Sequence, residues 1–286
     1  MNDPVEPGTE TVLVGGVLHW TADSHRENVL PIYLAHLRAM EVPPRYARMY
    51  GFVLDGCPPM VEIQMLRLLE APCSFLRVSL WEPDHMPEER GKRKRLDTFG
   101  HMAFVRNLLA DMALRLNCSH LLSVDGDIAL HSSSLGVLLG LARPQASVLI
   151  QNTPPPEEPW AWNILAFTMD GLRCTHIEPH AAGGLCDVTG AACLYDRDTL
   201  EHVRFWPDPQ GEDIGFGRAA RLRYGPPPCA FKAAYVPCGA EHLMVPEQVG
   251  PHLLSCAICR REGGVSRKEL AEVIPFRPRQ ETSKTS

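Results

Sequence analysis

The stretch Leu121-Leu122-Ser123-Val124-Asp125-Gly126-Asp127 is a short apolar run that ends in two aspartates one residue apart. Its first four residues have the composition of a buried β-strand. In an open α/β sheet, small substrates and their metals bind at the carboxyl ends of the strands. Two carboxylates placed there are hard oxygen donors for Mg²⁺ or Mn²⁺, and such an ion binds diphosphate in turn. Asp-Gly-Asp is also an ordinary turn sequence, so the rest of the chain must decide between a metal site and a turn.

The first half of the chain alternates strand-like apolar runs with segments that carry apolar residues at helical spacing. Strands are predicted at 11–18, 50–54, 75–80, 121–124 and 148–150, and helices at 26–40, 61–69, 99–116 and 132–141. The strand at 11–18 is apolar on both faces, as in a sheet that helices cover on both sides. The alternation predicts an α/β fold with a mostly parallel central sheet flanked by helices.

The segment Pro154-Pro155-Pro156 marks a change, after which the predicted elements are shorter and mixed. Strands are expected at 163–167, 191–195 and 233–236, a turn at Gly183-Gly184 and a helix at 213–224. We expect one domain over 10–255, with the parallel sheet mainly in 10–150 and a smaller mixed region in 151–255. Residues 256–286 are expected to form an extension that ends in a disordered polar tail.

Composition limits the location and the partners of the protein. The 286 residues carry a formal net charge of −6 at pH 7. The sequence has no run of about 18 apolar residues, so no membrane span is predicted. Its acidic start lacks the basic and then apolar profile of a secretory signal, which favours a cytoplasmic location. The acidic balance disfavours a nucleic acid as partner without excluding it. The basic run Lys92-Arg93-Lys94-Arg95 is either a solvated loop or an anion contact.

Ten cysteines are scattered along the chain. Without a secretory signal they are expected to be reduced and mostly buried. Cys256 and Cys259 form a single C-x-x-C pair, which is a weak zinc signal because a structural zinc site needs four ligands. Cys238, His242 and His252 lie nearby in the sequence and are available to complete such a site.

Four local patterns follow one another along the chain. They are Asp55 at a strand end, Arg106-Asn107 in the helix before the aspartate pair, Asp125-Gly126-Asp127 itself, and Gly211-Glu212-Asp213-Ile214-Gly215-Phe216 at a helix start. In this order they resemble the GT-A glycosyltransferases, particularly those of the family 2 type. The resemblance covers about residues 10–245 and includes a glycine-containing strand on the acceptor side at 188–195.

This resemblance implies a Rossmann-like GT-A fold that binds a nucleoside diphosphate sugar, linked to UDP or GDP, in its first half and the acceptor in its second. It assigns nucleotide contacts to Asp55 and to the Arg106-Asn107 pair. His19 follows the first strand at the edge where the base would lie, so it is a candidate for lining that pocket. Arg93, in the basic run, is a candidate diphosphate contact on a lid-like loop.

For the metal, the resemblance implies Mn²⁺ or Mg²⁺ at the aspartate pair. Asp127 is the expected direct ligand, while Asp125 is expected to bind through water or to hold the ribose. In such enzymes a late histidine often completes the metal shell. His242 is the best match in this sequence, and His252 is the alternative.

For catalysis, the resemblance implies that an acid of the Glu212-Asp213 pair deprotonates the acceptor hydroxyl or amine, which would invert the anomeric centre. Asp213 is the candidate base, with Glu212 beside it. Acids also suit a helix start for electrostatic reasons alone. Some mannosyltransferase relatives share the metal strand and retain configuration, so a retaining enzyme is the first alternative.

Two alternatives come from other functional classes. A sugar-phosphate nucleotidyltransferase also uses paired aspartates and Mg²⁺, but it should carry a glycine-rich phosphate loop with a nearby lysine after the first strand. Gly15-Gly16 has no such lysine. A non-catalytic nucleotide-sugar-binding module should have lost Asp127 or Asp213, and both are present. The sugar and the acceptor are not specified by these patterns, because acceptor loops vary freely on one fold.

Overall fold

The aspartate pair follows strand β4 (His120–Val124), the central strand of the molecule. A computed structural model describes residues 9–20, 26–78, 96–141, 144–152, 161–179, 183–232 and 240–243. Leu122 and Val124 of β4 enter one apolar layer and Leu121 enters the other. Apolar burial on both faces is the pattern of a strand inside a covered sheet.

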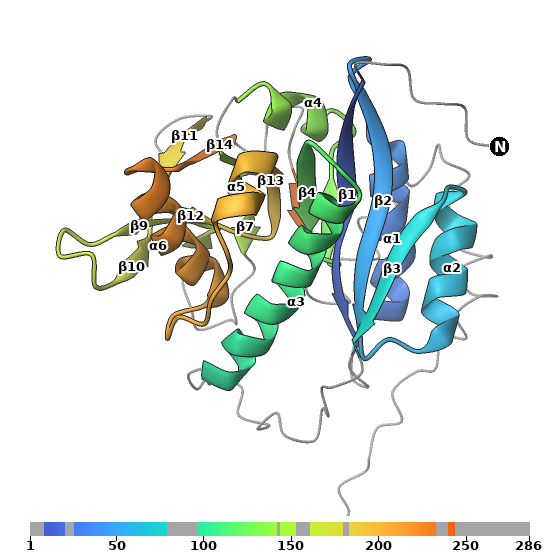
Figure 1. The fold of residues 1–286 in the computed structure, drawn as a ribbon, viewed down its shortest axis with the longest axis horizontal. Helices are drawn as coiled ribbons and strands as arrows, with labels where there is room; N and C mark the ends of the chain where they lie inside the picture. Colours follow the sequence, from blue (N-terminus) through green and yellow to red (C-terminus); the bar gives the residue numbers. More distant parts are fainter. Residues whose placement is uncertain are drawn as a thin grey trace, which may run out of the picture.

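β4 belongs to an eight-stranded sheet (Figure 1). In spatial order its strands are β11 (Gly183–Cys186), β14 (Cys229–Lys232), β6 (Gln145–Val148), β13 (Ala192–Asp196), β4, β1 (Glu10–His19), β2 (Tyr46–Asp55) and β3 (Cys73–Val78). The pairs β3–β2, β2–β1, β1–β4 and β6–β14 are parallel. Only β13 and β11 pair antiparallel with their neighbours in this sheet. The prediction of a mostly parallel α/β sheet is therefore confirmed.

Helices cover both faces of this sheet (Figure 1). One face carries α1 (Arg26–Ala39), α2 (Pro59–Leu69) and α4 (Ser134–Leu139), whose apolar residues join one core. The opposite face carries α3 (Leu96–Arg115), α5 (Arg197–His202) and α6 (Glu212–Tyr224), which share the second core. The structure thus has three layers, as the alternating sequence pattern predicts.

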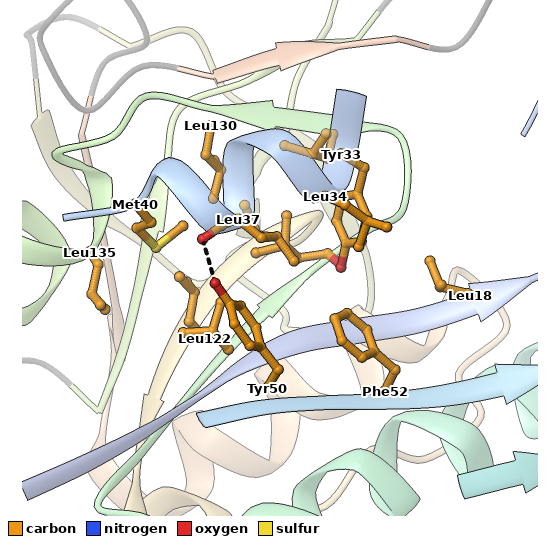
Figure 2. Close-up of a cluster of buried hydrophobic side chains, with 14 of the residues drawn as sticks. Leu18, Tyr33, Leu34, Leu37, Met40, Tyr50, Phe52, Leu122, Leu130 and Leu135 are labelled. Carbon is orange, nitrogen blue, oxygen red and sulfur yellow. Dashed lines mark hydrogen bonds between the residues drawn. The ribbon is translucent and has the colours of Figure 1, made fainter. Parts of the chain in front are cut away.

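Hydrogen bonds inside the first core fix α1 against the sheet. The Tyr50 hydroxyl donates to the carbonyl of Leu37 at 3.3 Å (Figure 2). The Tyr33 hydroxyl donates to the carbonyl of Val124 at 3.1 Å. The ring of Tyr33 meets Phe52 edge to face, with centroids 6.5 Å apart. Because Val124 is the residue before Asp125, the second of these bonds anchors the start of the aspartate turn.

Three smaller sheets lie mainly in the second half of the described chain. Their strands are β9 (Ile164–Phe167), β10 (Cys174–His176) and β12 (Val188–Thr189) in one sheet, β5 (Ile128–Leu130) and β15 (Ala240–His242) in another, and β7 (Gln151–Asn152) and β8 (Ala161–Trp162) in a third. The pairing of β5 with β15 matters most for function, because β5 begins one residue after Asp127.

Strand β6 differs from its prediction. The apolar run at 148–150 predicts a strand, yet β6 covers Gln145–Val148 and leaves Leu149 and Ile150 buried beyond its end. Two of its residues are polar and buried: Ser147 donates to the carbonyl of Ala192 at 2.9 Å, and Gln145 donates to the carbonyl of Thr189 at 3.4 Å. These partners come from distant segments, so the apolar pattern does not reveal the strand.

The expected turn at Gly183-Gly184 is wrong. Both glycines lie in β11, where Gly183 pairs with Lys232 and Gly184 with Phe231 of β14. Cross-strand pairing outweighs the local preference of the two glycines for a turn. The expected strand at 233–236 lies outside the described residues, as do residues 79–80 of the third predicted strand and the extension at 256–286.

Two further expectations concern thiols and membranes. The seven cysteines in the described ranges are all free, which agrees with reduced thiols. Cys238, Cys256 and Cys259 lie outside those ranges, so the zinc hypothesis is not tested. Among the helices that the structure describes, none combines the length and apolarity needed to span a lipid bilayer.

Candidate functional site

The sheet changes direction between β1 and β4. From β1 the chain proceeds outward to β2 and β3, and it then crosses to the other side of β1 to form β4. The carboxyl ends of two strands at such a switch point border the usual ligand crevice of an open α/β sheet. Here β1 ends at His19, and Asp125 directly follows β4. A ligand site is therefore expected at these two strand ends.

The aspartate pair forms a turn that neighbouring backbone holds in place. The Ile128 amide donates to the carbonyl of Asp125 at 3.0 Å, which closes the turn between β4 and β5. The Asp125 amide donates to the carbonyl of Ala191 at 2.7 Å, and the Leu243 amide donates to the carbonyl of Asp127 at 2.8 Å. The turn and the metal-site interpretations are thus compatible, because the turn fixes the backbone from which both carboxylates extend.

The predicted third metal ligand lies next to this turn along the backbone. His242 pairs with Ile128 in the β15–β5 ladder, one residue beyond Asp127. The side chain of His242 is outside the described part of the structure, as is the whole of His252. The structure thus brings the backbone of His242 to the aspartate pair, and its role as a ligand stays a prediction.

Arg106 links the aspartate turn to the Glu-Asp motif. Its guanidinium, from α3, lies 3.3 Å from Asp125, 3.1 Å from Glu212 and 3.9 Å from Asp213. The Arg106 side chain is only 8% exposed, and it also lies over the ring of Phe205 at 5.8 Å. Although burial lowers the pKa of Arg106, the three carboxylates outweigh burial and hold the pKa well above its ordinary value. The guanidinium therefore stays charged.

Burial changes the pKa of Asp125 in the direction opposite to its effect on Arg106. Burial raises the pKa of Asp125 above its ordinary value; the charges of Asp127 and Glu212 raise it further, and Arg106 opposes the rise. A carboxyl with a raised pKa among other acids is stabilised as an anion by any additional cation. A further cation near Asp125 would act in the same direction as Arg106 and oppose the rise in its pKa.

Gly190 makes room for the carboxylate of Asp213. A Cβ atom on Gly190 would lie 2.6 Å from Oδ2 of Asp213, so any other residue would displace this oxygen. The next residue, Ala191, has a positive φ of 68° and gives its carbonyl to the Asp125 amide. One short segment between β12 and β13 thus contacts both the aspartate turn and the Glu-Asp motif.

Glu212 and Asp213 have different surroundings although they are adjacent. The Glu212 side chain is 11% exposed and pairs with Arg106. The Asp213 side chain is 28% exposed and lies against Gly190. Of the two carboxylates, Asp213 is the more accessible to a substrate, while Glu212 mainly neutralises Arg106.

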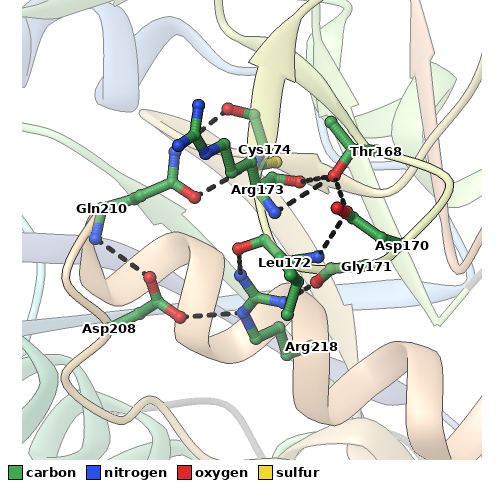
Figure 3. A network of polar contacts seen from close by, with 9 residues as sticks. All are labelled: Thr168, Asp170, Gly171, Leu172, Arg173, Cys174, Asp208, Gln210 and Arg218. Atoms are coloured by element: carbon green, nitrogen blue, oxygen red, sulfur yellow. Dashed lines mark hydrogen bonds and ion pairs between the residues drawn. The ribbon is translucent and has the colours of Figure 1, made fainter.

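The segment that leads into α6 is held by a polar network (Figure 3). The Gln210 side chain exchanges two hydrogen bonds with the backbone of Cys174, at 3.0 and 3.1 Å. Arg218 of α6 pairs with Asp208 at 2.8 Å and donates to the carbonyls of Gly171 and Leu172. These contacts fix the β9–β10 hairpin to α6. They also fix the position of the segment that precedes Glu212.

Asn107, predicted as a nucleotide contact, binds the protein backbone in this structure. Its amide nitrogen donates to the carbonyl of Phe205 at 2.8 Å, and its amide oxygen accepts from the Phe205 amide at 3.0 Å. Both ends of the side chain are used in this way. Asn107 thus attaches α3 to the segment before α6 and supports the aromatic neighbour of Arg106.

Asp55, predicted as a direct nucleotide contact, is completely buried. Its Oδ2 accepts hydrogen bonds from Nδ1 of His19 at 2.7 Å and from Nε2 of His101 at 2.8 Å. Burial raises the pKa of Asp55, but these hydrogen bonds outweigh burial and leave the pKa below its ordinary value. The structure thus brings Asp55 and His19 together and adds His101.

Two other predictions concern phosphate binding. Gly15 and Gly16 lie inside β1, where they pair with Gly51 and Phe52 of β2, so they form no phosphate-binding loop. This placement removes the feature that a nucleotidyltransferase would need there. Arg93 lies outside the described residues, and its role as a diphosphate contact stays a prediction.

The donor chemistry at the aspartate turn fits a hard divalent cation. Carboxylate oxygens are the ligands that Mg²⁺ and Mn²⁺ prefer, and the carboxylates of Asp125, Glu212 and Asp213 all lie within 4 Å of the single guanidinium of Arg106. Within the described ranges, no three His, Cys, Asp or Glu side chains form a ready metal cage. A metal held by Asp127 and Asp125 would therefore need oxygen atoms from a ligand, or a residue such as His242 whose side chain is not described.

Sequence reasoning missed His101. It lies on α3, five positions before Arg106, and its partner Asp55 is 46 residues away. A polar residue on a helix that packs against the sheet is a weak signal, because its partner is known only once the helix is placed. The predicted nucleotide contacts therefore include one residue, Asp55, that contacts two histidines from different elements.

No protein-family model matches the sequence, and the search of curated proteins finds no match. Two solved structures show general similarity. HddC from Yersinia pseudotuberculosis is 10% identical with a TM-score of 0.46, over 85% of this chain and 97% of that chain. The glycosyltransferase GlyE in Streptococcus pneumoniae TIGR4 is 10% identical with a TM-score of 0.36, over 79% of this chain and 45% of that chain.

The contact between Gly190 and Asp213 gives a structural prediction. Gly190→Ala is expected to rotate the Asp213 carboxylate away from its position beside the 188–191 segment, since the new Cβ would lie 2.6 Å from Oδ2. A crystal structure of the variant measures this displacement. Gly100→Ala is the matched control, because a Cβ on Gly100 meets nothing within 4 Å. An Asp213 carboxylate that stays in place in Gly190→Ala would contradict the predicted contact.

The Asp55 environment gives a prediction for the pH dependence of stability. A carboxyl whose pKa is lowered by folding stabilises the folded state above its unfolded pKa, and this contribution is lost as the pH falls through the folded pKa. Asp55→Asn removes the contribution. The free energy of unfolding of the variant should lie furthest below that of the wild type at neutral pH. The gap should narrow once the pH falls below the ordinary aspartate pKa of about 3.9. Urea unfolding across this range measures the gap, and a constant gap would refute the assignment.

Proposed function

We propose that this protein is a glycosyltransferase that moves a sugar from a nucleoside diphosphate sugar, UDP- or GDP-linked, to a hydroxyl or amine of an acceptor. The proposal includes Mn²⁺ or Mg²⁺, inversion at the anomeric carbon and a cytoplasmic location. The observation that carries it is the arrangement around Arg106, where the aspartate turn after β4 and the Glu-Asp start of α6 meet at the switch point of the sheet. Acids from two distant motifs thus share one small region.

A donor of this kind explains why such acids would gather there. The nucleoside diphosphate is a leaving group on which negative charge develops, and a divalent ion at the diphosphate would stabilise that charge as a Lewis acid. Asp127 and Asp125 are the residues that would hold the ion, with His242 as the third candidate. Arg106 balances part of the carboxylate charge in the absence of a donor.

Asp213 would act on the acceptor. In the proposed step the acceptor oxygen or nitrogen forms a bond to the anomeric carbon, while the bond from that carbon to the β-phosphate oxygen breaks. The acceptor proton moves to a carboxylate oxygen of Asp213, and the nucleoside diphosphate leaves with the bonding electrons. Glu212 suits this role less, because its carboxylate lies closer to Arg106, at 3.1 Å against 3.9 Å for Asp213, and is less exposed.

The first test is metal-dependent binding of the leaving nucleotide. The wild-type protein should melt at a higher temperature with UDP or GDP when Mn²⁺ is present, because a ligand that binds only the folded state stabilises it by about 2.7 kcal/mol at 100 times its Kd. Asp127→Ala should abolish the metal-dependent part of the shift. Asp111→Ala is the matched control: this aspartate, with a side chain 43% exposed, lies on α3 and pairs with Arg204 at 2.7 Å. An unaltered shift in Asp127→Ala would exclude Asp127 as the ligand, and no shift in the wild type would refute the function.

The second test separates binding from chemistry. Asp213→Asn should still bind the nucleotide with Mn²⁺ but hydrolyse the donor at least about 100-fold more slowly, since a positioned general base contributes about 10²–10⁴-fold. Hydrolysis is a suitable assay because water takes the place of the acceptor and the released nucleoside diphosphate is measured. Asp198→Asn, at an exposed aspartate of α5, provides the control substitution. Equal rates in Asp213→Asn and the wild type would eliminate Asp213 as the base.

A further inference from the structure

We propose that His19, held in one orientation and one tautomer by Asp55, recognises the ring N–H of the donor's base and selects uracil or guanine over cytosine and adenine. The inference rests on the proposed function. It assigns a direct contact to His19 and makes Asp55 a positioning residue that acts through the histidine. The combination of burial and hydrogen bonding around Asp55 carries it.

The Asp55 side chain is too buried to contact a nucleotide base itself. None of its surface is exposed, and Oδ2 is already occupied by His19 and His101 at 2.7 and 2.8 Å. Its other oxygen, Oδ1, is buried and has no hydrogen-bond partner among the residues that the structure describes. A ligand outside the protein therefore senses Asp55 only through the rings that contact it.

The carboxylate fixes which nitrogen of His19 carries the proton. An ionised carboxylate only accepts hydrogen bonds, and the lowered pKa of Asp55 keeps it ionised. Nδ1 of His19 must therefore donate, so in the neutral ring Nε2 is a lone-pair acceptor. Nε2 lies on the side of the imidazole away from Nδ1 and hence away from Asp55. The ring is 21% exposed, against none of Asp55, so the histidine is the member of the pair that reaches solvent.

The position of His19 suits a base contact. It is the last residue of β1, at the strand end that borders the switch point, and Asp125 lies at the end of the adjacent strand β4. A nucleotide whose diphosphate lies at the aspartate turn would have its base directed along the strand ends. His101 bonds the same oxygen from α3, which fixes Asp55 from the helix side and leaves its geometry rigid.

A fixed acceptor discriminates among bases by simple chemistry. Uracil and guanine carry a ring N–H at the edge that pairs with other bases, and this N–H can donate to Nε2 of His19. Cytosine and adenine present a ring nitrogen lone pair at the same place, which repels the lone pair of the histidine. A fixed acceptor therefore favours UDP and GDP over CDP and ADP.

Calorimetric titration of the full-length protein with UDP, GDP, CDP and ADP in the presence of Mn²⁺ tests the recognition. The wild type should prefer UDP or GDP. His19→Phe keeps an aromatic ring without nitrogens and should reduce that affinity by about tenfold, which is the scale of one hydrogen bond, and it should remove the preference. His202→Phe is the matched control, because His202 is an exposed histidine on α5 that pairs with Asp198. Binding of inorganic pyrophosphate with Mn²⁺ should be equal in all three proteins.

Nitrogen NMR of ¹⁵N-histidine-labelled protein tests the positioning role of Asp55. At neutral pH the signal that disappears in His19→Phe should have the pattern of a ring protonated at Nδ1. In Asp55→Asn the same signal should shift toward the ordinary mixture of tautomers, and the preference for UDP or GDP should weaken. A merely structural role of Asp55 would lower stability without altering this signal.

The outcomes separate the inference from the function. No nucleoside diphosphate binding by the wild type would overturn both. Wild-type binding with the same affinity and base preference in His19→Phe would overturn the inference alone, as would a His19 ring protonated at Nε2. Loss of pyrophosphate binding in His19→Phe would also overturn it, because the residue would then act on the phosphates or on the fold.

Discussion

The buried guanidinium of Arg106 is the contact on which the rest of the site depends. It joins α3 to the turn after β4 and to the start of α6, although Arg106 and Glu212 are 106 positions apart in the chain. Charges removed from water are tolerated only when they are paired with good geometry. Without Arg106 the buried carboxylate of Glu212 would lose its counter-charge, so α3, β4 and α6 have little freedom to shift relative to one another. The cluster is thus a constraint on the fold as well as a feature of the site.

The sheet supplies the other half of this constraint. The Tyr33 hydroxyl binds the carbonyl of Val124, and the Asp125 amide binds the carbonyl of Ala191, so the aspartate turn is attached on both sides. Pairing of β15 with β5 adds a third attachment through Leu243. A backbone held at three points presents its carboxylates in a fixed direction. Preorganisation of this kind is what a site that stabilises developing charge requires.

The sequence predicts those parts of the fold that local apolar patterns determine. β4 and β1 are recognisable because apolar residues are buried on both of their faces. β6 is not, because Gln145 and Ser147 are buried through partners in distant segments. Gly183-Gly184 resembles a turn until β14 pairs with it. At the candidate site, the motif order predicts Asp125, Asp127, Glu212 and Asp213, but the pairing of His101 with Asp55 requires α3 to be placed first.

Burial divides the motif residues into two groups that their order along the chain does not distinguish. Asp125, Asp213 and His19 are 33%, 28% and 21% exposed, and each lies beside a more buried partner. Arg106 and Asp55 are those partners, and both are buried. Membership of a sequence motif is therefore a poor guide to direct ligand contact by itself. In this protein one member of each pair reaches solvent, while the other is buried and sets the electrostatic surroundings of its partner.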